Sequence, residues 1–93
     1  MKERMRERRY DFDMAYEHLR SLIGEPEKSD TYFRWSFDVG SIYLTRKDIN
    51  VIYDNRGRNQ AQISLNKVTN FSIDSSKLLF IWIGDDFIVF EAR

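Results

Sequence analysis

Acid–base chemistry in this chain would depend on a single histidine. His18 is the only histidine among the 93 residues, and Glu17 beside it could tune it as a general base. No nucleophile lies near it in the sequence, and it falls between the apolar positions Ala15 and Leu19. We therefore interpret His18 as a surface or boundary residue of a helix, and we predict no catalytic residue and no enzymatic activity.

Two pairs of carboxylates could in principle serve a metal ion or a hydrolase. Asp11 and Asp13 form one pair, and Asp85 and Asp86 form the other. That chemistry needs further converging ligands, whereas Asp is common at helix caps and turns because its side chain accepts hydrogen bonds from nearby amides. Because the chain has no cysteine and one histidine, we expect no metal site and no cofactor.

Positive charge is concentrated at the amino end of a chain whose net charge is zero. Residues 1–9 hold five basic and two acidic side chains, so they carry +3 and the remainder carries −3. The basic arm, residues 1–10, could follow nucleic-acid phosphates while Tyr10 stacks on a base, although a pI of about 6.6 argues against this. The candidate anion-binding residues are Lys2, Arg4, Arg6, Arg8 and Arg9 in the arm, and Arg56, Arg58 and Lys77 at turns that would share one end of a meander.

Length and composition indicate one soluble domain. Residues 1–93 suffice for a single core, and 42% hydrophobic residues is typical of a globular chain. No apolar run approaches the ~18 residues of a transmembrane helix, and the amino end does not resemble a signal peptide. We therefore expect a cytoplasmic protein without a transmembrane segment.

Residues 11–23 have the spacing of an amphipathic helix. Asp11 or Asp13 can cap its first amides, and Gly24-Glu25-Pro26 ends it. The apolar face continues into the basic arm, so the helix could begin near Lys2. The apolar residues recur three or four positions apart, at Phe12, Ala15, Tyr16, Leu19, Leu22 and Ile23.

Residues 31–91 change to a period of two, which is typical of antiparallel strands. Seven short apolar runs are separated by turn residues such as Asn55-Arg56-Gly57-Arg58 and Gly84-Asp85-Asp86. We therefore predict an α+β fold in which an amino-terminal amphipathic helix precedes a seven-stranded antiparallel meander, closed into a barrel or divided into a sandwich of two sheets. The predicted strands cover residues 33–37, 42–44, 49–53, 61–65, 71–73, 78–83 and 87–90.

The last two predicted strands are apolar on both faces, whereas an antiparallel strand with one wet face alternates. Something must then cover the second face, and the candidates are the helix or another chain. Aromatic residues make up 15% of the chain, and Tyr and Trp are frequent in interface hot spots. We predict a protein interface that draws on Phe12, Leu19, Trp82, Ile88 and Phe90.

Three segments resemble the bacterial pleckstrin-homology-like domains, including the GRAM-type relatives. The resemblance spans about residues 22–90 and implies a seven-stranded, strongly bent sheet closed by a carboxy-terminal helix. No residues remain for that helix, so we expect the helix at 11–23, or a second copy of the chain, to take its place. The segments are Ser21-Leu22-Ile23-Gly24-Glu25, Gly40-Ser41-Ile42-Tyr43-Leu44-Thr45 followed by Ile49, Val51 and Ile52, and Ile63-Ser64-Leu65-Asn66-Lys67-Val68.

Some members of that family bind phosphoinositides through basic residues in the first hairpin. The corresponding loop, Asp38-Val39-Gly40-Ser41, has no Lys or Arg, and Asp85 and Asp86 would repel a phosphate. The sequence therefore argues against phosphoinositide binding.

The function that we predict is non-enzymatic interaction with protein. The chain would act as a small microbial or phage regulator, inhibitor or immunity protein, through self-association as a homodimer or through a partner. The alternative is binding of nucleic acid or an anionic surface through the basic arm.

Overall fold

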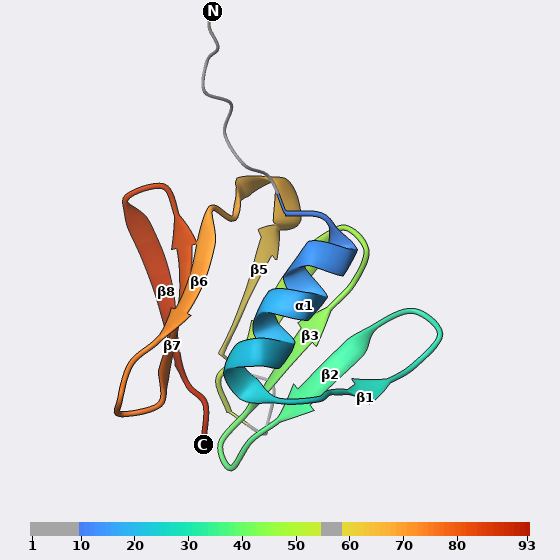
Figure 1. Ribbon diagram of the computed structural model, residues 1–93. Helices are drawn as coiled ribbons and strands as arrows, with labels where there is room; N and C mark the ends of the chain where they lie inside the picture. The colour runs from blue at the N-terminus through green and yellow to red at the C-terminus, as the bar shows by residue number, and fades with distance from the viewer. Residues whose placement is uncertain (1–9, 55–58) are drawn as a thin grey trace, which may run out of the picture.

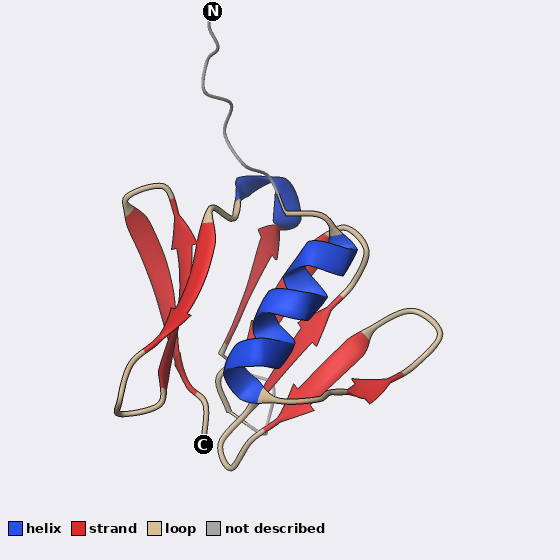
Figure 2. Cartoon of the chain, in the orientation of Figure 1, coloured by secondary structure: helices blue, strands red, loops and turns tan. Residues whose placement is uncertain are grey.

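The fold is α+β, with one α-helix followed by antiparallel strands in two sheets (Figures 1 and 2). The computed structural model describes residues 10–54 and 59–93. No helix within these ranges has the length and apolar character needed to cross a membrane. In chain order the elements are α1 (Phe12–Ile23), β1 (Glu27–Lys28), β2 (Phe33–Ser36), β3 (Ser41–Leu44), β4 (Asp48–Ile52), β5 (Gln60–Ser64), the 3-10 turn η1 (Leu65–Lys67), β6 (Asn70–Ile73), β7 (Leu78–Ile83) and β8 (Asp86–Glu91).

The sequence predicted the class correctly, but two of its details are wrong. Among the described residues, eight strands are present in place of seven, because the two-residue strand β1 pairs with β2 before the predicted strand region begins at residue 31. The strands do not close into a barrel; five form one sheet in the order β1-β2-β3-β4-β5, and three form another in the order β6-β7-β8. Of the two predicted arrangements, a barrel or a sandwich of two sheets, the described strands support the division into two sheets.

Helix α1 begins at Phe12 and not at the amino terminus of the chain. Asp11 is its N-cap, with backbone φ −105° and a side chain that accepts a hydrogen bond from the Met14 amide at 2.9 Å. Tyr10 before it is not helical, so the helix does not continue into the basic arm at this point. At the other end Gly24 adopts a positive φ of 94° and donates its N–H to the Arg20 carbonyl, which ends the helix as predicted.

The two sheets are separated at a point where the spacing of buried residues along the chain changes from two to three. The sequence predicts a strand over residues 61–65, but β5 ends at Ser64 and a 3-10 turn follows. Leu65 and Val68, three positions apart, are both buried, which is the spacing of a 3-10 turn and not of a strand. The chain therefore leaves the five-stranded sheet at Leu65 and begins the three-stranded sheet at β6.

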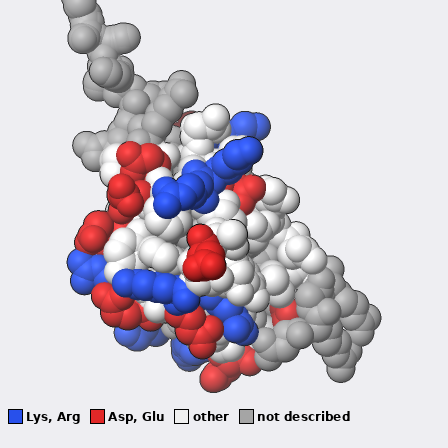
Figure 3. All heavy atoms as spheres, turned by 90° about the vertical axis from the view of Figure 1, so that its right-hand side faces the viewer, with Lys and Arg blue, Asp and Glu red and all other residues white. Residues whose placement is uncertain are grey.

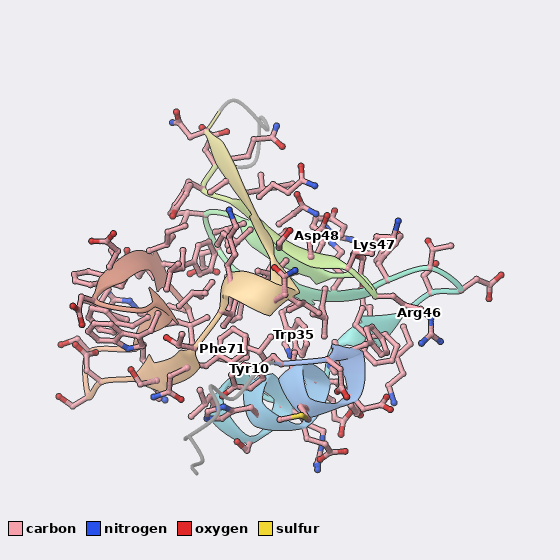
Figure 4. The ribbon with its side chains drawn as sticks, turned by 90° about the horizontal axis from the view of Figure 1, so that it is seen from above. Tyr10, Trp35, Arg46, Lys47, Asp48 and Phe71 are labelled. Carbon is pink, nitrogen blue, oxygen red and sulfur yellow. The ribbon has the colours of Figure 1, made fainter. Side chains whose placement is uncertain are left out.

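Helix α1 covers the inner side of the molecule, where it packs against both sheets. Its fully buried residues Ala15 and Leu19 lie four positions apart, on one face of the helix. The indole Nε1 of the buried Trp35 on β2 donates to the Gly24 carbonyl at 2.6 Å, which ties the five-stranded sheet to the end of the helix. From above, Tyr10 and Phe71 lie next to one another beside α1 (Figure 4), and their ring centroids are 4.9 Å apart.

The turn between β2 and β3 fits against β4 only because of a glycine. Gly40 is buried, and a Cβ atom added there would overlap the carbonyl oxygen of Ile52. We predict that Gly40→Ala lowers the free energy of unfolding by about 1–3 kcal/mol, because backbone must shift to admit the methyl group. Denaturant unfolding will measure this, with Val39→Ala as the control, since Val39 in the same turn is exposed. Equal stability of the two variants would contradict the prediction.

Candidate functional site

The β7–β8 hairpin gives the three-stranded sheet two different faces. In its register Phe80 lies opposite Val89 and Trp82 lies opposite Phe87, so these four side chains share one face. The alternate residues point the other way and build the core. We call the first of these the outer face. Its apolar residues are Leu78, Phe80, Trp82, Phe87 and Val89, and the polar residues Glu91 of β8 and Asn70 and Ser72 of β6 share it.

Three aromatic rings of the outer face contact one another. The ring centroids of Trp82 and Phe87 are 5.0 Å apart, those of Phe80 and Phe87 are 5.2 Å apart, and those of Phe80 and Trp82 are 5.9 Å apart. The indole Nε1 of Trp82 donates to the Ser72 hydroxyl on β6 at 3.0 Å. The three rings thus pack against one another across β7 and β8, and the one polar atom among them, the Trp82 Nε1, is hydrogen-bonded to β6.

The apolar side chains of the outer face are partly exposed to solvent. Phe87 keeps 49% of its surface accessible and Val89 keeps 38%, while Leu78, Phe80 and Trp82 are half-buried. Helix α1 does not cover it, because α1 packs on the opposite face of β6, where Phe71 lies. The predicted cover of the second face by the helix is therefore wrong, and among the described residues this face stays open.

The five-stranded sheet shows what an ordinary wet face looks like in the same molecule. Arg34, Tyr43, Asn50 and Gln62 lie opposite one another across four strands on the side away from the core. Polar residues on that side are what solvent exposure favours in an antiparallel sheet. The apolar residues Leu78, Phe80, Trp82, Phe87 and Val89 of β7 and β8 depart from this rule, so the outer face carries an exposed apolar patch.

The same strand also presents an open edge. Among the described residues β8 pairs only with β7, so its other side is unpaired over Asp86–Glu91. Natural edge strands usually carry Lys, Pro, a bulge or extreme shortness that blocks pairing with another chain. Strand β1 is protected in this way by its two-residue length, whereas β8 is six residues long and holds Phe87, Ile88, Val89 and Phe90.

The five residues predicted for an interface are not on one surface. Leu19 and Phe90 are buried in the core at 0% and 2% exposure, so neither is accessible to a partner. Ile88 is half-buried and packs against that core from the inner side of β8. Phe12 lies at the start of α1 against Phe33, with the Arg46 guanidinium 5.0 Å above its ring. Trp82 alone of the five belongs to the outer face.

Sequence reasoning missed Phe80, Phe87 and Val89, although the signal was present. Phe80 is two positions from Trp82, and residues two apart on a strand share a face. The turn at Gly84-Asp85 fixes the pairing of Trp82 with Phe87, whereas Ile88 and Phe90 fall on the opposite face. The sequence shows apolar residues on both faces of β7 and β8, but it does not by itself show which face packs against the core.

His18 lies in a shallow pocket beside the amino end of α1. Its Nδ1 is 2.8 Å from the Tyr10 hydroxyl, which also donates to the Asn70 side-chain oxygen at 3.4 Å. Burial lowers the pKa of His18 below its ordinary value of 6.5. These contacts join the segment that precedes the N-cap of α1, the middle of α1 and the start of β6. The pocket has a volume of about 730 Å³, and it is lined by Tyr10, Asp13, Met14, Glu17, His18, Thr69 and Asn70.

Most candidate anion-binding residues fall outside the described part of the chain. Residues 1–9, with the cations of the basic arm, and residues 55–58, with Arg56 and Arg58, are not described. Lys77 is described: it has a positive φ of 68° at the turn between β6 and β7, and it lines a pocket with Arg93. On the face seen in Figure 3, Lys and Arg side chains are interspersed with Asp and Glu. Ion pairs of the described residues include Arg34 with Glu27.

Phe87 and Phe90 form a matched pair on β8 that separates the outer face from the core. We predict that Phe90→Ala lowers the free energy of unfolding by about 3–5 kcal/mol, because it leaves a cavity in the core. Phe87→Ala removes a half-exposed ring, and we expect it to cost about 1 kcal/mol or less. Denaturant unfolding of both variants will measure the difference, and equal losses would contradict this assignment of faces.

The lowered pKa of His18 predicts a dependence of stability on pH. The unfolded chain binds the proton at a higher pH than the folded one, so the free energy of unfolding falls as pH drops below 6.5. Unfolding of the wild type and of His18→Gln at about pH 7.5 and pH 5.5 will isolate this effect, because carboxylate contributions are shared. We expect a smaller loss in His18→Gln; equal losses in both proteins would exclude His18 as the source.

Comparisons with protein-family models, with curated proteins and with solved structures find no match for this chain. The resemblance of Gly40–Thr45 and Ile63–Val68 to pleckstrin-homology-like domains therefore stays a prediction. The function has to be argued from the geometry described above.

Proposed function

We propose that the chain is a non-enzymatic module that binds another protein through the outer face of the three-stranded sheet. The observation that carries the proposal is the contrast between the two sheets. One sheet has a polar wet face with Arg34, Asn50 and Gln62, while the other exposes Phe87 and Val89.

The chemistry of the outer face suits a protein partner. Large rings contribute most of the contact area and energy at interfaces because they bury wide surfaces and lose little conformational entropy. Phe80, Trp82 and Phe87 already pack against one another, so they lose little further freedom when a partner covers them. The charged turn Arg46–Asp48 lies on the other side of the molecule from β8 (Figure 4), while Asn70, Ser72 and Glu91 share the face of the sheet with the rings and add polar groups beside them.

The proposal assigns no catalytic role to the Tyr10–His18 pocket. The Nδ1 of His18, the sole histidine of the sequence, is engaged with the Tyr10 hydroxyl, which also bonds Asn70. Those contacts support a structural function, since they join α1 to β6. The more specific prediction of a regulator, inhibitor or immunity protein concerns the partner, which the geometry does not identify.

Nucleic-acid binding through the basic arm stays the alternative prediction. Its cations lie in residues 1–9 and 55–58, outside the described ranges, so the geometry adds no support. The described cations Arg20, Lys28 and Arg34 are each within 4.0 Å of a glutamate, which reduces the attraction of this surface for phosphate.

Affinity capture with matched variants will test the proposed binding surface. The immobilised chain is used as wild type, as Phe87→Lys on the outer face, and as Gln62→Lys on the wet face of the other sheet. Each variant adds one lysine at an exposed strand position of a different sheet, and Gln62→Lys also removes the hydrogen bond from Gln62 to the Asp48 carboxylate. We expect proteins that the wild type and Gln62→Lys retain to be lost from Phe87→Lys, as measured by quantitative mass spectrometry of the eluates.

Thermal denaturation of the three proteins serves as the control for folding. If the three folded proteins retain the same partners in the same amounts, the outer face is not the binding surface.

A further inference from the structure

The open edge of β8 has a definite hydrogen-bonding pattern. The Ala92 amide donates to the Lys77 carbonyl across the β7–β8 ladder. Because bonded and non-bonded pairs alternate along an antiparallel ladder, Phe90 and Ile88 also direct their backbone groups toward β7. Phe87, Val89 and Glu91 therefore direct theirs away from β7, to the unpaired side.

The unpaired part of β8 is limited at both ends by contacts with the rest of the chain. The Arg93 carbonyl, next in the alternating series, accepts a hydrogen bond from the Asp38 amide at 2.8 Å. At the other end the chain turns at Gly84 and Asp85 into β7. The unpaired run thus consists of Phe87, Val89 and Glu91, and Val89 is its centre.

We propose that a second copy of the chain occupies this edge, with its β8 antiparallel to the first and Val89 opposite Val89 of the second copy. In this register Phe87 lies opposite Glu91 of the second copy, and Glu91 lies opposite its Phe87. All three outward residues of each copy then exchange backbone hydrogen bonds. A shift by two residues would leave outward groups at the ends unpaired, so the symmetric register makes the most bonds.

The charges at the two ends of β8 favour the same antiparallel orientation. Asp85 and Asp86 lie at its beginning, whereas Arg93 follows its end, where Lys77 also lies. Antiparallel pairing brings the acidic beginning of each strand to the basic end of the other, although Arg93 is also ion-paired with Glu91 of its own chain. Parallel pairing would instead place the acidic residues of both copies together, which costs energy.

The pairing rests on the proposed function and extends it, because it joins two outer faces. The two sheets become one continuous sheet, and the outer-face residues Phe87 and Val89 of both copies meet at the twofold axis. This doubled apolar surface is wider than either half, and a single partner can bridge both copies. A symmetric dimer with the same patch from each copy is also the commonest form of protein oligomer.

Charge substitutions at Val89 test both the second copy and the register. Light scattering over a dilution series should give the wild type as a dimer at about 100 µM, which is a hundredfold above a micromolar Kd. Val89→Lys and Val89→Glu should each raise the Kd about fivefold or more, because like charges then face each other at the axis. Mixing the two variants should restore the dimer, because the introduced lysine of one copy meets the introduced glutamate of the other only if position 89 lies opposite itself.

The absence of cysteine provides a second measurement that does not depend on charge. Val89→Cys introduces one thiol at the axis, and directly opposite Cα atoms of a bonded antiparallel pair are about 5.5 Å apart, within the range of a disulfide. Mild oxidation should then yield a covalent dimer much faster than it does for Val39→Cys, whose exposed residue lies in the β2–β3 turn.

A monomeric wild type at that concentration would overturn the proposal, as would a mixture of the charge variants that does not associate, or equal rates of crosslinking at residues 39 and 89. Because Phe87 also lies on the proposed edge, light scattering of Phe87→Lys separates loss of the outer face from loss of the dimer, since a monomer can still retain a partner there. The two proposals can therefore fail independently.

Discussion

The two sheets share no strand-to-strand ladder, so the fold depends on what lies between them. Among the described residues, the backbone hydrogen bond from the Asp38 amide to the Arg93 carbonyl joins the turn after β2 to the chain after β8. The remaining cohesion comes from side chains, above all Leu19 of α1 and the residues it buries against both sheets. Helix α1 therefore determines the angle between the sheets, and it can do so only from their common inner side.

This arrangement explains why one apolar face is left over. A domain of this size has one core, and α1 together with the inner faces of both sheets fills it. The side of the five-stranded sheet that faces away from the core carries polar side chains, as is usual for a solvent-exposed face. The three-stranded sheet retains Phe80, Trp82 and Phe87 there, at positions that add little to the core. Because these side chains contribute little to the stability of the fold, the folded state does not explain why they are large and apolar.

The sequence was informative wherever the cause of structure is local. The cap at Asp11, the end of α1 at Gly24 and the alternation of β2 to β4 all follow from neighbouring residues. It was misleading at Leu65, because a spacing of two and a spacing of three both place that side chain inside. The burial of Phe90 and the exposure of Phe87 could not be told apart, since which face of β8 turns inward depends on a helix some seventy residues away.

The contrast between the two tryptophans has a practical consequence. Trp35 is 3% exposed and donates to the end of α1, whereas Trp82 lies half-buried on the outer face. The two indoles therefore occupy environments of different polarity, and their intrinsic fluorescence is sensitive to different events. Emission from Trp35 follows the integrity of the core, and emission from Trp82 follows what covers the sheet. The chain thus carries its own pair of optical reporters, one for folding and one for occupancy.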